Sequence, residues 1–211
     1  MKGYLLRMTT PQSFDDSCPS GLSGRLLISV PQLDDGPFEK SVVLIASHDT
    51  EHAFGVIVNK PIAGLMAADA VAEVRLSPSL TAETAPVFFG GPCDPQRGMV
   101  LHSDEYQSKE TILAGNGLAL TATRDALERL YGDQLRPHSS RLIAGHAGWA
   151  AGQLDEELRR NFWLDMPATP DFVFGEAPET MWDTAFAQLG IDQTSLSALS
   201  MGDPTDLAPL N

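Results

Sequence analysis

Three short apolar runs, each followed by a turn-forming segment, constrain most strongly what this chain can fold into. The runs occupy residues 56–58, 87–89 and 142–144 and lead into Asn-Lys-Pro, Gly-Gly-Pro and Gly-His-Ala-Gly-Trp. Short runs rich in β-branched and aromatic residues and bounded by Gly, Pro or Asn predict strands that end in loops. Rigid strands hold such loops in place, so binding groups often lie on them.

The remaining patterns predict a strand-rich first half and a second half in which helices and strands alternate. We expect strands at residues 25–30, 41–46, 54–58, 86–89, 98–102, 111–113, 141–144 and 171–174. We expect helices at residues 65–74, 123–132, 153–163 and 179–189, the second of them capped by Thr123. The second and third strands are joined by about five polar residues, which predicts a hairpin. This mixture predicts an α+β fold with a mixed β-sheet and clustered helices, and disfavours a doubly wound parallel sheet.

The length of 211 residues is enough for one domain with its own core. Residues 1–23 are polar and rich in turn formers, and we expect them to form a flexible N-terminal tail. The predicted domain then spans residues 24–200, and residues 201–211 form a C-terminal tail. The sequence does not determine the oligomeric state.

The net charge of the chain limits the kinds of partner that it can bind. Lys and Arg number 14 and Asp and Glu 28, so the net charge is −14. Such a field repels nucleic acid and anionic membranes, and it favours a basic protein partner unless it serves solubility alone. We find no apolar run of the roughly 20 residues that a membrane helix needs, and no signal peptide. The two cysteines, Cys18 and Cys93, fit a reducing compartment, so we expect a cytoplasmic protein, with one disulfide left open.

Known motifs for metals and cofactors fit the sequence poorly. The segment His48-Asp49-Thr50-Glu51-His52 matches the inverted zinc-protease pattern, which needs both histidines on one helix face. Here it connects two β-branched runs and is too short for a helix. No phosphate-binding loop, dinucleotide fingerprint or nucleophile elbow is present. We therefore expect no metal, no cofactor and no catalytic set.

The candidate ligand-binding residues all follow predicted strands or lie near their ends. They are Asn59, Lys60, Gly90, Gly91, His102, Gly148 and Trp149. Asn59 and Lys60 supply an amide and a cation, and the glycines allow a close approach to the backbone. The alternative interpretation assigns them structural roles, with glycines in turns, Asn59 bonded to its own loop and Trp149 in the core.

Several blocks, read together, resemble the YqgE/AlgH family of bacterial proteins over about residues 23–192. They include Gly55-Val56-Ile57-Val58-Asn59-Lys60-Pro61, Phe89-Gly90-Gly91-Pro92, Arg97-Gly98 with Leu101-His102, and Gly148-Trp149 with Gly152-Gln153-Leu154-Asp155-Glu156-Glu157. The resemblance implies a compact α+β domain with coiled, bifurcated β-sheets and a cluster of helices, in a cytosolic protein. Members are mostly uncharacterised, and some are called transcriptional regulators through a link with alginate production. Cys93 stands where the family usually has an aliphatic residue, and His146 where it often has tyrosine, which weakens catalytic roles for both.

These observations lead to one main functional hypothesis and two alternatives. The main hypothesis is a non-enzymatic cytosolic module that binds a small molecule or a protein and regulates transcription indirectly. The first alternative is a hydrolase or transferase of unassigned class with His48 or His102 as general base. The second, direct DNA binding, needs a basic face, and the sequence contains no cluster of Lys and Arg.

Overall fold

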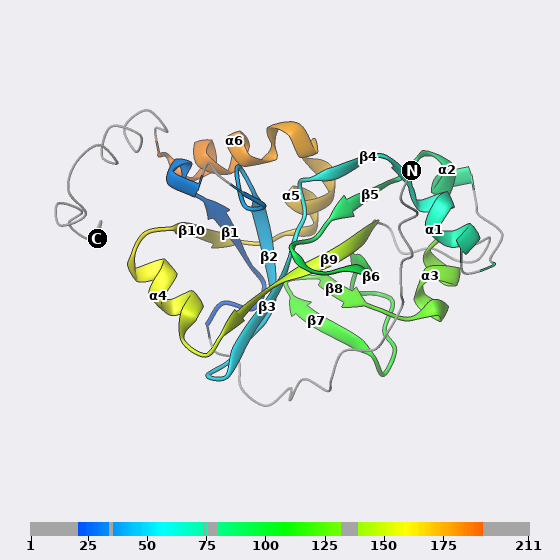
Figure 1. Cartoon of the computed structure of the whole chain (residues 1–211), viewed down its shortest axis with the longest axis horizontal. Coiled ribbons are helices and arrows are strands. Elements are labelled where there is room, and N and C mark those ends of the chain that lie inside the picture. The colour runs from blue at the N-terminus through cyan, green and yellow to red at the C-terminus, as the bar shows by residue number, and fades with distance from the viewer. Residues whose placement is uncertain (1–20, 34–35, 74, 76–79, 132–138, 192–211) are drawn as a thin grey trace.

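The computed structural model describes residues 21–33, 36–73, 75, 80–131 and 139–191 (Figure 1). The predicted tails fall mainly on residues 1–20 and 192–211, outside the described residues, as do Cys18 and the predicted helix end at Gly132. In the part of the chain that is described, no helix is both long and apolar enough to span a bilayer.

The described residues form a mostly antiparallel sheet of ten strands (Figure 1). The strands are β1 (Arg25–Ser29), β2 (Val42–His48), β3 (His52–Ile57), β4 (Pro61–Met66), β5 (Pro86–Phe89), β6 (Cys93–Ser103), β7 (Thr111–Gly115), β8 (Leu118–Thr121), β9 (Ser140–Ala150) and β10 (Trp163–Pro167). Their order along the main path is β10-β1-β2-β3-β9-β6-β8-β7. The predicted hairpin of the second and third strands is confirmed by the antiparallel pairing of β2 with β3.

The sheet branches at β9, which has different neighbours along its length. Its first half pairs in parallel with β5, through Val87↔Leu142, and antiparallel with β6. Its second half pairs antiparallel with β3, through Phe54↔Gly148. The strand β5 pairs on its other side with β4. The long strand β9 therefore joins the two parts of the sheet and brings the ends of β3 and β5 side by side.

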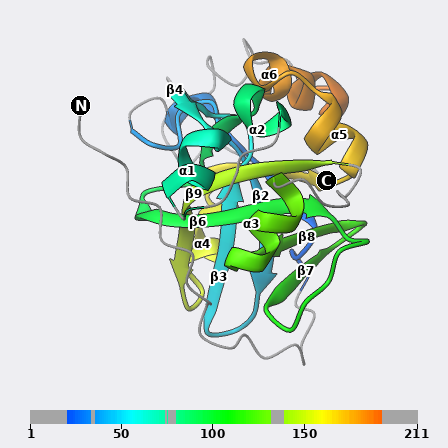
Figure 2. The same cartoon turned by 90° about the vertical axis from the view of Figure 1, so that its right-hand side faces the viewer.

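The helices lie against the sheet in three groups (Figures 1 and 2). The first group contains α1 (Ala67–Glu73), α2 (Leu80–Thr84) and α3 (Arg124–Tyr131), and the second contains α5 (Pro170–Gly175) and α6 (Pro178–Leu189). The third contains α4 (Gln153–Arg159) alone, and a 3-10 turn, η1 (Pro31–Leu33), follows β1. Each group covers its own cluster of buried apolar side chains. The fold is therefore α+β, as the sequence predicts.

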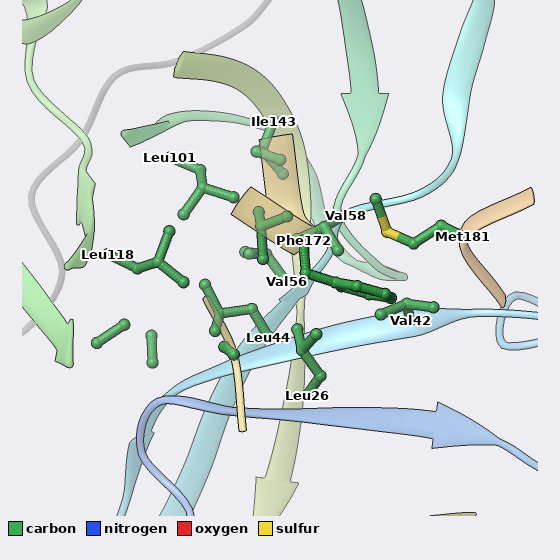
Figure 3. Close-up of a cluster of buried hydrophobic side chains, with 14 of the residues drawn as sticks. Leu26, Val42, Leu44, Val56, Val58, Leu101, Leu118, Ile143, Phe172 and Met181 are labelled. Carbon is green, nitrogen blue, oxygen red and sulfur yellow. The ribbon is translucent and has the colours of Figure 1, made fainter. Parts of the chain in front are cut away.

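The largest apolar cluster lies between the sheet and helices α5 and α6 (Figure 3). Strand residues such as Leu26, Leu44 and Val56 meet Phe172 and Met181 from the helices, and Leu26, Leu44, Val56 and Met181 have no exposed surface. Burial of large side chains at this level contributes roughly 1.5–3 kcal/mol each before the entropy of folding is subtracted. This cluster gives the strands a rigid support on one face.

Two predicted elements differ from the structure, one in its type and one in its length. The run at residues 171–174 forms the helix α5 and not a strand, because Pro170 opens a helix that Thr169 caps, with Phe172 N 3.2 Å from Thr169 Oγ1. The helix predicted at 153–163 ends at Arg159, and Trp163 begins β10, which pairs with β1. A short apolar run does not distinguish a strand from a buried helix.

The third predicted loop is also wrong, because residues 145–149 continue the strand β9. Gly145 has φ 76, a left-handed conformation that glycine adopts without strain, and the chain then resumes pairing with β3. Smaller differences concern β4, β8 and β10, which we did not predict, and α1, which begins at Ala67 rather than residue 65. Thr123 does cap α3, since its Oγ1 accepts from Ala126 N at 3.1 Å.

Candidate functional site

The three segments singled out in the sequence meet in the structure through backbone hydrogen bonds. Ile57 N donates to Gly90 O at 2.8 Å, and Gly90 N donates to Ala144 O at 2.7 Å. Phe89 N donates to Lys60 O at 2.8 Å. The end of β3, the end of β5 and the middle of β9 therefore lie side by side, although they are far apart in the sequence.

Gly90 and Gly91 allow this close approach of backbone to backbone. A methyl carbon built on Gly90 would lie 2.2 Å from Gly145 O, and one built on Gly91 would lie 2.3 Å from the carbonyl group of His146. Contacts this short exclude any side chain. The glycines thus pack β5 and the following turn onto β9.

Asn59 is a buried residue that fixes the start of β2. Its Oδ1 accepts from Val42 N at 2.9 Å, and its Nδ2 donates to Lys40 O at 2.9 Å. Because both polar ends of the side chain bond backbone groups, Asn59 has a structural role here, holding Lys40 and Val42 at the start of β2.

Lys60 borders a cavity of about 300 Å³. The cavity is lined by Lys60, Pro61, Ile62, Phe89, Pro95 and Ala144. Lys60 Nζ donates to Pro37 O at 2.9 Å, which holds the ammonium group near the connection between β1 and β2. Partial burial lowers the pKa of Lys60, and the carboxylate of Glu39 opposes that shift.

Gly148 and Trp149 border a second cavity of about 240 Å³, which we call the aromatic pocket. It is lined by Leu33, Phe38, Pro92, Gly148, Trp149, Gln153, Glu157, Phe162 and Trp163. Pro92 follows Gly90 and Gly91, so the turn after β5 contributes to this pocket while Phe89 contributes to the other. The converging segments therefore border two cavities rather than one.

Glu157 fixes the two indole rings of the aromatic pocket. Its Oε2 accepts from Trp149 Nε1 and from Trp163 Nε1, each at 2.8 Å, and its Oε1 accepts from Gln153 Nε2 at 2.9 Å. The two tryptophans are only 5% and 4% exposed, so both N–H groups need a partner inside the protein. One carboxylate of α4 thereby holds rings from β9 and β10 in a single orientation.

Three aromatic rings pack against one another beside Glu157. The ring centroids of Phe38 and Trp163 are 5.5 Å apart in an edge-to-face arrangement, and those of Trp149 and Trp163 are 6.1 Å apart at 77°. The rings of Phe38 and Trp149 stack with centroids 6.4 Å apart. These separations match those of favourable aromatic pairs. The pocket thus combines π faces with a carboxylate.

His102 lies apart from both cavities. It has no exposed surface, its Nδ1 donates to Ser103 O at 2.9 Å, and its Nε2 accepts from the Thr121 hydroxyl at 2.9 Å. Burial lowers the pKa of His102, and nearby carboxylates and the Ser103 carbonyl oppose the shift. With both ring nitrogens engaged and no access from solvent, His102 ties β6 to β8.

His48 and His52, the other histidines weighed in the sequence, flank the turn of the hairpin formed by β2 and β3. His48 is the last residue of β2, and His52 is the first residue of β3. The His48 Nε2 lies 3.8 Å from Asp155 Oδ1, beyond hydrogen-bond distance. Asp49 Oδ1 accepts from the backbone N of His52, which closes the turn. Among the described residues, no group of three or more metal-binding side chains comes together.

Cys93 and His146 lie opposite each other on β6 and β9. Cys93 is a free, half-buried thiol. Burial and the charge of Arg97 lower the pKa of His146, and Asp94 opposes this. His146 Nδ1 and Arg97 Nε are buried and find no hydrogen-bond partner. Nothing in this arrangement hydrogen-bonds the thiol in the way that a nucleophile–base pair requires.

Only Gly148 and Trp149 of the aromatic pocket were candidate residues in the sequence, and Phe38, Glu157 and Trp163, which form its polar and aromatic contacts, were missed. Phe38 follows a turn signal, and Glu157 and Trp163 fall in a segment that we predicted as one helix. The end of α4 after Arg159 separates Glu157 from Trp163, so their meeting depends on a helix end that the residue pattern did not predict. A glutamate between two tryptophans is the one available signal.

A sequence profile described as AlgH-like matches residues 26–194. The chain belongs to the AlgH-like family. A UPF0301 protein of Caulobacter vibrioides is 40% identical over 185 residues, which cover 87% of this chain and 95% of the relative. A UPF0301 protein of Ruegeria pomeroyi is 41% identical over 179 residues, covering 84% and 96% of the two chains.

Solved structures support the same assignment. The solution structure of the AlgH protein from Pseudomonas aeruginosa has a TM-score of 0.71 and 32% identity, and the match covers 88% of this chain and 97% of that one. A crystal structure of protein DIP2367 from Corynebacterium diphtheriae has a TM-score of 0.67 at 21% identity, covers 84% and 92% of the two chains, and supports the fold alone. The resemblance seen in the sequence is therefore confirmed, and the family is one of uncharacterised proteins.

Proposed function

We propose that this protein is a non-enzymatic binding module that regulates transcription indirectly, by binding a basic protein partner. In this proposal a lysine or arginine side chain of the partner enters the aromatic pocket. The observation that carries the proposal is the pair of tryptophans oriented by Glu157.

The chemistry of the pocket suits a cation. Aromatic faces attract Lys and Arg groups through the ring quadrupole, most strongly for tryptophan. The Glu157 carboxylate adds a negative charge, and its Oε1 accepts one hydrogen bond, from Gln153, so a second lone-pair direction is available. The guanidinium carbon of Arg160 already lies 4.7 Å from the ring centre of Phe162 at the pocket border. Cation–π contact is thus the chemistry that this border uses within the chain itself.

The size of the pocket supports a side chain rather than a whole metabolite. Its volume of about 240 Å³ falls below the roughly 300–1,000 Å³ of most small-molecule sites. One long side chain can fill such a space, while the rest of the partner contacts the surrounding surface.

The charge distribution supports a basic partner as well. Asp155 is exposed on α4 near Glu157, Glu156 pairs with Arg159, and the whole chain carries a net charge of −14. Opposite charge on a partner increases the rate of association, and the effect weakens as salt is added.

Isothermal titration calorimetry with a short lysine- and arginine-rich peptide tests the proposal. We expect binding that weakens with salt, and no binding of an acidic peptide of equal length. Glu157→Gln should weaken binding at least about tenfold, because the cation of the bound peptide loses the carboxylate with which it pairs. Glu128→Gln, on the exposed face of α3, removes the same charge far from the pocket and is the matched control.

Equal weakening by the two variants would show that net charge alone attracts the peptide, and the pocket would then play no part. Trp163→Phe keeps an aromatic ring but removes one N–H donor, so it should weaken binding less than Trp163→Leu. An equal effect of both substitutions would contradict a role for the π face.

A further inference from the structure

The cavity beside Lys60 combines one cation with apolar walls. Of its described lining residues, Lys60 alone carries a charge, and Ile62, Phe89 and Pro95 supply apolar atoms. The ammonium group has three donors, and Pro37 O takes one of them. Two donors remain for an anion, which would compete with the nearby Glu39 carboxylate for the ammonium group.

The strand β4, whose Pro61 and Ile62 line this cavity, contains one of the two exposed large hydrophobic side chains in the described part of the chain, Met66. Its sequence is Pro-Ile-Ala-Gly-Leu-Met, none of its six residues is fully buried, and Met66 is 39% exposed. The pairing with β5 joins Pro61 to Phe88 and Met66 to Pro86. Five steps along β4 therefore match two steps along β5, and the chain between them forms a bulge. Exposed apolar surface that continues from a cavity marks a binding surface.

We propose that this cavity and β4 bind a small carboxylic acid with an extended apolar chain. The carboxylate pairs with the Lys60 ammonium group, and the chain lies in the cavity and along Ile62 and Leu65. This site is separate from the aromatic pocket and takes a ligand of opposite charge, so the inference does not depend on the proposed function.

A carboxylate fits this site better than a phosphate. A phosphate dianion requires several donors or cations, which proteins supply with arginine clusters or helix termini. Here a single lysine borders a cavity whose walls are mainly apolar. A single negative charge attached to a hydrocarbon chain satisfies both parts of the site.

Partial burial of Lys60 is consistent with this pairing. Its lowered pKa reflects loss of contact with water, and Glu39 supplies the opposing negative charge. A ligand carboxylate at the border would stabilise the charged form further.

Nuclear magnetic resonance titration with sodium octanoate, below its micelle concentration, tests the proposal. We expect the Ile62 and Leu65 methyl signals to shift with saturation. Binding should strengthen by up to about fourfold for each methylene added between hexanoate and decanoate, the effect of burying one CH₂ group. Octanol, which lacks the charge, should bind at least about tenfold more weakly.

Variants separate charge from shape. Lys60→Met keeps an apolar stem and should weaken octanoate binding at least about tenfold, while Lys60→Arg should retain it. Lys109→Met, at an exposed position, is the matched control and should bind as the unmodified protein does. Unchanged octanoate binding in Lys60→Met, or shifts located at the aromatic pocket, would overturn the proposal. Binding of the basic peptide should be the same in Lys60→Met, so failure of one proposal is distinguishable from failure of the other.

Discussion

Replacement of Glu157 by leucine should destabilise the protein more than the same replacement of the adjacent Glu156. The carboxylate accepts from the indole N–H groups of Trp149 and Trp163, each at 2.8 Å, and both rings are buried. Leucine leaves two buried donors unpaired at about 1–3 kcal/mol each. Because Glu157 is itself only partly buried, we expect a loss of about 3 kcal/mol in the free energy of unfolding.

Two companion variants isolate the cause. Glu157→Gln keeps an oxygen that can accept from the indoles and should cost only about 1 kcal/mol, the difference between a charged and a neutral acceptor. Glu156→Leu makes the same change in side-chain type one position earlier, where the residue is exposed and pairs with Arg159. It should cost less than about 1 kcal/mol, as surface ion pairs do.

Urea denaturation, monitored by far-ultraviolet circular dichroism, measures these differences in unfolding free energy. It does not depend on tryptophan fluorescence, which the substitutions at residue 157 would themselves change. We expect the unmodified protein to have the highest free energy of unfolding. Glu156→Leu and Glu157→Gln should follow close together, and Glu157→Leu should have the lowest value. If Glu157→Leu were as stable as Glu156→Leu, the two indoles would not depend on this carboxylate, and the reasoning about the pocket would be wrong.

Further predictions concern the convergence of the strands and the buried polar groups. Gly90→Ala should lower the free energy of unfolding by at least about 2 kcal/mol, because the added methyl would lie 2.2 Å from a backbone oxygen of β9. Gly148→Ala, whose added methyl would have its closest neighbour at 3.9 Å, should lower it by less than about 0.5 kcal/mol. Equal losses in thermal unfolding would contradict the packing argument. Asn59→Ala should cost about 2 kcal/mol by urea unfolding, because it leaves the buried N–H of Val42 unpaired, and a loss of ligand binding without a loss of stability would contradict its structural role. Folding lowers the pKa of His102 from 6.5, so the unfolded chain takes up the proton first, and the free energy of unfolding should fall as the pH falls below about 6.5. Urea titrations at about pH 7.5 and 5.5 should show a smaller fall for His102→Gln than for the unmodified protein. An equal fall would contradict this assignment.

The regular parts of the fold could be predicted because their signals are local. The strands β1, β2, β3 and β5 follow from compact β-branched runs, and α6 follows from apolar spacing with Gly190 at its end, where φ is 69. Thr123 marks the start of α3 through a side-chain hydrogen bond to a residue three positions on. Each of these signals involves residues a few positions apart.

The errors arise where tertiary contacts decide between two local options. In the sequence, Gly145 predicts a loop, but β9 continues through this residue because it pairs with three neighbouring strands. The Phe-Val-Phe run of α5 reads as a strand, but the cap at Thr169 and the apolar cluster it enters make it a helix. For β9, pairing with other segments outweighs the local turn signal. For α5, two local signals were missed, the cap at Thr169 and the proline at the first helical position.

The sequence singled out segments that meet in the structure, but it did not identify most of the residues that line the two cavities. Lys60 and Trp149 each border a cavity, and the three segments do meet. His102 was included among the candidate residues because the strand β8 was not predicted, and the Thr121 hydroxyl on this strand hydrogen-bonds the His102 ring. Phe38 and Trp163 reach the aromatic pocket from distant parts of the chain, and such contacts leave no periodic pattern.

The indole N–H resonances of the three tryptophans test the central claim most directly. Trp149 and Trp163 line the aromatic pocket, while Trp182 on α6 donates to Ser29 O at 2.8 Å in the core and serves as an internal reference. On titration with the lysine- and arginine-rich peptide, we predict that the signals of Trp149 and Trp163 shift together and saturate while that of Trp182 stays in place. Saturable binding that leaves both pocket signals unmoved would show that the partner binds elsewhere on this protein.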